Sequence, residues 1–101
     1  MQVYVNTASL RDEPLRLKRR ADADYSVMVK DLRAGRIVAG MTPGMVMMWE
    51  WTITGPYIPV ELQPSNGREE TLNAAKIAFK AKFEAWQAWA EGLGHDVVWH
   101  G

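Results

Sequence analysis

The chain has 101 residues, 48% of them hydrophobic, and twelve basic residues balance twelve acidic ones. A chain of this length forms one small domain whose core five tryptophans can largely fill, and its zero net charge excludes a uniformly basic nucleic-acid-binding domain. The absence of cysteine excludes disulfides and thiolate metal sites, and no apolar run approaches the roughly 20 residues that span a bilayer.

Residues 1–24 are polar and carry the weakest structural pattern. The start, Met1 to Asn6, lacks the basic and then apolar pattern of a signal peptide, so we expect a cytoplasmic protein. Leu15 and Leu17 alternate with charged residues as they would in a strand. We expect this segment either to be partly disordered or to form a short edge strand around residues 15–19.

Alternating apolar and polar residues predict three strands, over residues 25–30, 36–41 and 45–54. Gly35 and the run Thr42-Pro43-Gly44 supply turns between them, and such short connections indicate an antiparallel meander. In the third strand one side is almost wholly apolar and needs cover. That side comprises Met45, Met47, Trp49, Trp51 and Ile53.

The cover is predicted to be a long helix from Glu69 or Thr71 to Glu91, a stretch without proline or glycine. Thr71 is its expected N-cap, and Gly92 and Gly94 supply its end. Its apolar stripe comprises Leu72, Ala75, Phe79, Phe83, Trp86, Ala90 and Leu93. We therefore predict an α+β fold over residues 25–94, in which the C-terminal amphipathic helix packs on one face of a three-stranded antiparallel meander, followed by a tail at 95–101. Trp49 or Trp51 should pack against Phe79, Phe83 and Trp86.

The sequence contains no recognisable catalytic motif. His95, Asp96 and His100 lie near the C-terminus without further convergent ligands, so we expect no metal site there. Glu50 has no partner for acid–base catalysis. We expect a protein that is not an enzyme and that binds no cofactor.

Three motifs carry a resemblance over roughly residues 25–90: Gly35-Arg36-Ile37, Trp49-Glu50-Trp51, and Thr71 to Lys76 leading into a Phe/Trp-rich helix. With them the chain resembles a group of small, mostly uncharacterised bacterial proteins with a β-β-β-α core. The order of elements is also similar to the three-stranded DNA-binding modules of AP2 factors and phage-type integrase arms. That second likeness implies a sheet that enters the major groove, but Glu50 and the neutral charge depart from the basic sheet face of such modules.

Two functions are then expected, from different classes. The first is a non-enzymatic interaction module, either a homodimer or a binder of another protein, which uses the 55–67 loop or the sheet face opposite the helix. That face comprises Met28, Lys30, Arg36, Val38, Val46, Met48 and Glu50. The motivation is this mixed apolar surface and an uneven charge, +3 over residues 1–36 and −3 over the remainder.

The alternative is a nucleic-acid-binding module of the β-β-β-α type, whose basic residues would contact phosphates. The contacts would come from Arg16, Lys18, Arg19, Arg20, Lys30, Arg33 and Arg36. Neither hypothesis involves a membrane or a metal, and an enzyme is the third and least favoured class.

Overall fold

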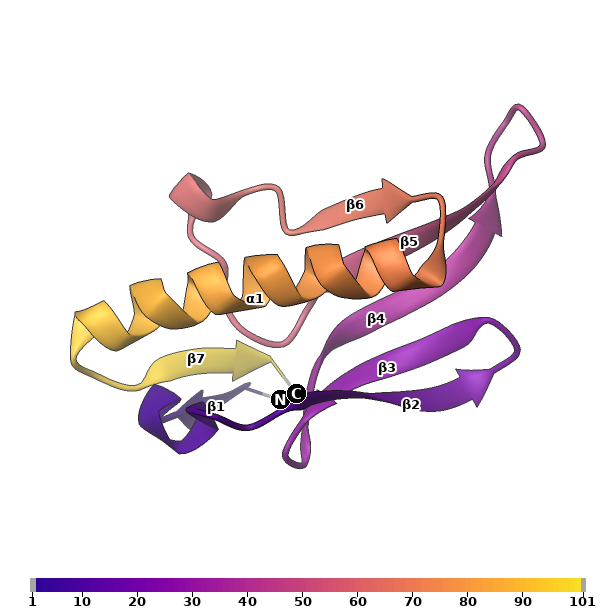
Figure 1. Ribbon diagram of the computed structural model, residues 1–101. Coiled ribbons are helices and arrows are strands. Elements are labelled where there is room, and N and C mark those ends of the chain that lie inside the picture. The colour runs from indigo at the N-terminus through magenta and orange to yellow at the C-terminus, as the bar shows by residue number, and fades with distance from the viewer. Residues whose placement is uncertain (1, 101) are drawn as a thin grey trace.

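A five-stranded antiparallel sheet crossed on one face by a single long helix forms the body of the molecule (Figure 1). The computed structural model describes residues 2–100. The sheet comprises β2 (Leu15–Ala21), β3 (Asp24–Val29), β4 (Leu32–Met41), β5 (Met47–Ile53) and β6 (Asn66–Glu69). The helix is α1 (Leu72–Leu93). A separate two-stranded sheet pairs β1 (Gln2–Val5) with β7 (Val97–His100). Two short 3-10 helices, η1 (Thr7–Leu10) and η2 (Val60–Leu62), lie in the connections.

The α+β class, the antiparallel pairing and the single long helix are as the sequence predicts. The sheet, however, has five strands and not the three of the predicted meander. The three predicted strands correspond to β3, β4 and β5, at the centre of a sheet that runs in chain order from β2 to β6. The turn predicted at Gly35 is wrong, because β4 begins at Leu32 and Gly35 pairs with Val27 and Ile53 inside the sheet. One further strand is added at each edge. The sheet is therefore wide enough that one helix covers only part of its face.

The helix forms for the reasons visible in its sequence. The Thr71 hydroxyl accepts a hydrogen bond from the Ala74 N–H at 3.0 Å, which satisfies one of the free donors of the first turn. Gly94 closes the other end with a φ of 72°, a left-handed conformation that glycine adopts without strain. Between them the buried residues are Ala75, Phe79, Phe83, Trp86 and Ala90.

Trp51 of β5 joins this helix stripe to the sheet. Its indole meets Phe79 edge to face at 6.3 Å and is 6% exposed, whereas Trp49 is half-buried and stacks on Tyr25. The predicted burial of a strand tryptophan under the helix is therefore confirmed for Trp51. Gly67 of β6 lies beneath the same indole, because a Cβ there would come within 2.7 Å of Trp51 Nε1.

The core also draws on residues outside the expected 25–94 unit. Residues 1–24 contribute β1, η1 and β2, and the tail contributes β7. Trp99 of β7 is 1% exposed and packs edge to face on Phe83 and Trp86. Leu10 of η1 is equally buried. Both ends of the chain thus complete the core under the C-terminal half of α1.

The segment 55–67 is held in place at several points, although the sequence suggested a long loop. The Gly55 carbonyl accepts a hydrogen bond from the His100 N–H at 2.6 Å. Lys82 donates to the Leu62 carbonyl at 3.0 Å, and Ile58 is buried. This segment connects β5 to β6 as a fixed part of the fold.

Candidate functional site: the β2 edge and its groove

The helix does not lie over the middle of the sheet. It packs mainly on β5 and β6, with a smaller contact to β4. The helix-side face of β2 and β3 therefore lies beside α1 and not beneath it. Strand β2 is also an edge strand of the sheet. The backbone groups of β2 that point away from β3 face no further strand of the sheet.

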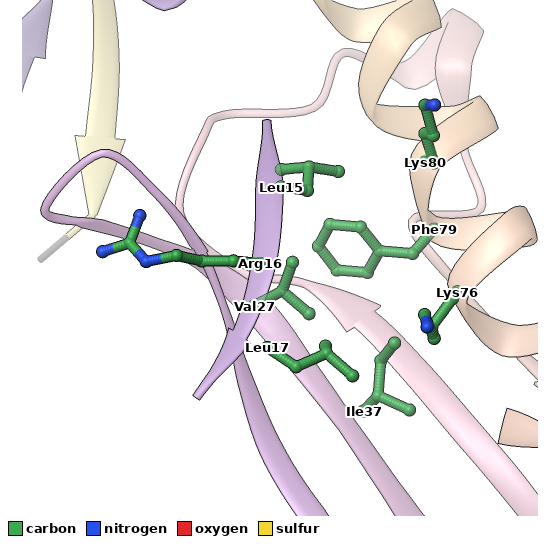
Figure 2. Close-up of a pocket in the computed structure, with 8 residues that line it drawn as sticks. All are labelled: Leu15, Arg16, Leu17, Val27, Ile37, Lys76, Phe79 and Lys80. Atoms are coloured by element: carbon green, nitrogen blue, oxygen red, sulfur yellow. The ribbon is translucent and has the colours of Figure 1, made fainter. Parts of the chain in front are cut away.

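A groove of about 380 Å³ runs between β2 and α1. Its walls and floor are mostly apolar and come from the strands and the helix together. The lining residues are Leu15, Arg16, Leu17, Val27, Ile37, Lys76, Phe79 and Lys80. Figure 2 shows Leu15 directed toward Phe79, Leu17 directed toward Ile37 on the same side, and Arg16 directed to the other side of β2. A volume of this size is within the range of ligand-binding clefts.

Lys76 and Lys80 stand on the helix side of this groove, one turn apart. Both are exposed, and neither takes part in the four ion pairs found among residues 2–100. The groove is therefore apolar inside and positively charged along one border.

A second hollow, of about 640 Å³, continues the groove along α1 and shares Leu15 and Lys80 with it. Here the lining turns acidic, through Glu13 and Glu84. Glu91, at the far end, accepts a hydrogen bond from Arg11 at 3.3 Å. Lys80 therefore lies between the groove and the acidic hollow, whereas Lys76 lines only the groove.

The sheet face opposite α1 is basic on balance. By register its basic residues are Arg16, Lys18, Arg33, Arg36 and Arg68, and its acidic residues are Asp24 and Glu50. Strand β2 adds two of the basic residues by joining the sheet. The aromatic residues of the five strands are Tyr25, Trp49 and Trp51, and all three share the opposite, helix-side face.

Two ion pairs neutralise part of this charge. Arg36 donates two hydrogen bonds to the Asp24 carboxylate, at 3.0 and 2.9 Å. Those bonds hold the pKa of Asp24 below its ordinary value, against the effect of desolvation and with help from the charges of Arg36, Arg20 and Arg33. Arg68 donates to Glu50 at 2.8 Å.

The residues predicted as an interaction face do not form one surface. Met28, Arg36, Val38, Met48 and Glu50 share the outer face, as expected, and all except Arg36 are half-buried. Lys30 occupies the β3–β4 turn with a φ of 54°, and its ammonium donates to the Ser9 carbonyl at 3.2 Å.

Val46 lies in the exposed turn between β4 and β5 and likewise stands apart from that face. Its exposed apolar neighbours there are Met41, Met45 and Met47. Figure 1 shows this turn projecting from the body of the molecule.

The residues predicted as nucleic-acid contacts are brought together in part. Arg16, Lys18, Arg33 and Arg36 share the outer face, and Arg20 lies at a bulge near the tip of the β2–β3 hairpin. Arg19 belongs to the helix-side face by register and pairs with Asp22. Lys30 is held at the turn described above.

The groove itself escaped prediction. Leu15 and Leu17 have the alternation of a strand, and the four-residue spacing of Lys76 and Lys80 places them on one side of the helix. No sequence signal, however, places the helix over β5 and β6, and the groove depends on that placement.

The described part of the chain, residues 2–100, contains no group of three His, Cys, Asp or Glu side chains arranged to hold a metal ion. The His95 ring is hydrogen-bonded at 2.7 Å to the Asp96 carbonyl. Within the same residues, no helix is long and apolar enough to cross a membrane.

Comparison of the chain with protein-family models, with curated proteins and with solved structures finds no match. Its function therefore has to be argued from the site alone.

Proposed function

We propose that the protein is a non-enzymatic interaction module that binds an extended segment of a partner protein along β2. The observation that supports this most is an edge strand that borders an apolar groove. A sheet edge supplies main-chain hydrogen bonds for affinity, and pockets beside it select alternate side chains. The β2 edge offers both an open strand backbone and an apolar groove beside it.

The outer sheet face supports a protein partner less well. Its apolar residues Met28, Val38 and Met48 lie on the three central strands, which are paired on both edges, and protein interfaces usually depend on well-packed apolar or aromatic anchors. The groove offers Leu15 and Leu17, which are also half-buried but lie on the edge strand itself, with the buried Phe79 in the groove lining.

The test is a titration of ¹⁵N-labelled protein with short peptides of strand-forming sequence. We expect the amide signals of residues 15–21 to shift, because a strand added at the edge would pair with this backbone. The matched control is the same peptide methylated at alternate backbone nitrogens, which removes donors from one of its edges. Equal binding of both peptides, or shifts confined to other strands, would refute strand addition.

One observation favours nucleic acid as a second candidate. Because β2 belongs to the sheet, Arg16 and Lys18 lie on the same face as Arg33 and Arg36, and a two-stranded basic ribbon such as β2–β3 can enter the major groove of DNA. Against it, the face carries no aromatic side chain from the five strands on which bases could stack.

This candidate is tested by measuring duplex and single-stranded DNA binding over a range of salt concentrations. Arg16→Ala with Lys18→Ala should weaken binding and reduce the salt slope by about 0.9 for each lost phosphate contact on duplex DNA. The control, Lys76→Ala with Lys80→Ala, removes the same charge from the helix side and should leave the DNA affinity and the salt slope unchanged. No binding at low salt would eliminate the candidate.

A further inference from the structure

We infer that the segment bound at β2 alternates apolar with acidic residues, the apolar ones facing the groove and the acidic ones facing the outer side of the sheet. This inference rests on the proposed strand addition and names the chemistry of the partner.

The alternation follows from β2 itself. Leu15 and Leu17 pair with Val29 and Val27 and face the helix side, whereas Arg16 and Lys18 face outward. A strand added next to β2 follows the same pleat, so its successive side chains also point to opposite faces. Its groove-side residues would contact the two leucines, and its outer residues would lie opposite two cations.

The charges of β2 are available for such a partner. Arg36 and Arg68 are occupied by Asp24 and Glu50, but the ion pairs among residues 2–100 include neither Arg16 nor Lys18. Both side chains are exposed. Carboxylates directly across the strand from them would form favourable cross-strand pairs, whereas basic residues there would repel.

The same charges disfavour a second copy of this chain as the occupant. Antiparallel pairing of two β2 strands would place the basic outer residues of one copy against those of the other, on the same face. Basic side chains along an exposed edge are a known defence against such edge-to-edge association. An acidic strand from a different protein meets no such repulsion.

The experiment compares three peptides of about eight residues, matched to the length of β2. They alternate valine with glutamate, with lysine or with serine, and their ends are blocked. We expect the Val/Glu peptide to bind about tenfold more tightly than the Val/Lys peptide at low salt, with the preference shrinking as salt rises. Shifts of the residue 15–21 amides locate the binding.

Two variants of the protein sharpen the result. Lys18→Glu should remove most of the preference for the Val/Glu peptide, and Arg16→Glu combined with Lys18→Glu should reverse it. The matched control is Arg68→Glu, which makes the same charge change on the same face but on β6, the opposite edge. It should leave the preference unchanged.

The outcomes separate the inference from the function on which it rests. If the Val/Ser or Val/Lys peptide binds as tightly as Val/Glu, the partner chemistry is wrong although strand addition stands. If no strand peptide binds, and only DNA shifts the outer-face signals, the proposed strand addition and the inferred partner chemistry are both wrong. A mass that doubles in light scattering, together with shifts at residues 15–21, would make a second copy the occupant and overturn the inference.

Discussion

Two tryptophans in one core cluster differ by a single hydrogen bond. Trp86 and Trp99 pack edge to face, with 5.9 Å between ring centroids, and are 0% and 1% exposed. Trp99 Nε1 donates to the Arg33 carbonyl at 3.1 Å, whereas Trp86 Nε1 has no partner among residues 2–100. The same substitution, tryptophan to phenylalanine, should therefore have different costs at the two positions.

The magnitudes follow from the groups that each change removes. A phenyl ring in place of an indole leaves a cavity of roughly 40 Å³, which costs about 1 kcal/mol at either site. Trp99→Phe also leaves the Arg33 carbonyl without its partner, which adds about 1–3 kcal/mol. Trp86→Phe instead removes an unpaired buried N–H, and the gain offsets the cavity. We expect a loss of about 2–4 kcal/mol for Trp99→Phe and a change near zero for Trp86→Phe.

The assay is urea unfolding followed by far-ultraviolet circular dichroism, because tryptophan fluorescence itself changes with the substitution. The slope of the unfolding free energy against urea should stay constant, so that midpoints compare stabilities. Equal midpoints for the two variants, or a larger loss for Trp86→Phe, would refute the hydrogen-bond reasoning.

Three further predictions use the same unfolding measurement. Gly35→Ala should cost at least about 2 kcal/mol, because the new Cβ would lie 2.7 Å from the Phe79 ring of α1. The control is Gly40→Ala on the same strand, where a Cβ meets nothing within 4 Å; it should change stability by at most about 0.5 kcal/mol. Arg36 holds the pKa of Asp24 below its ordinary value, so this carboxylate stabilises the fold above about pH 4 and less as the pH falls through its folded-state pKa; Asp24→Asn should reduce the acid-induced loss, and an unchanged acid profile would contradict this. Thr71→Ala should cost about 1 kcal/mol through the lost N-cap, and Thr71→Ser should restore most of it.

The helix and the central strands were predictable because their sequence patterns are complete. The stripe of α1 repeats with the helical period, and β5 alternates apolar with polar residues from Trp49 to Ile53. The two patterns together predict the contact between Phe79 and Trp51. The edge strands lack such patterns. In β6 the residue beneath Trp51 is Gly67, which contributes no apolar signal of its own, and in β2 the basic residues outnumber the leucines.

The candidate site was less predictable than the fold. Each of its residues belongs to a recognisable element, but the groove exists because α1 is displaced toward β6. In this position α1 contacts the edge strand β6, and its C-terminal half packs on the core that contains Trp99 and Leu10. Such contacts join residues far apart in the chain, and local periodicity carries no information about them.

The pairing of β1 with β7 sets Gln2 opposite His100, so the first and the last strand of the described residues are neighbours. Bringing together segments roughly 90 residues apart costs about 4 kcal/mol of loop-closure entropy. A short linker from β7 to β1 would turn this long-range pairing into a contact between neighbours in sequence. The chain could then be opened in the exposed turn at residues 42–46 without cutting a core strand. The fold would then depend on which elements are neighbours, and not on their order along the chain.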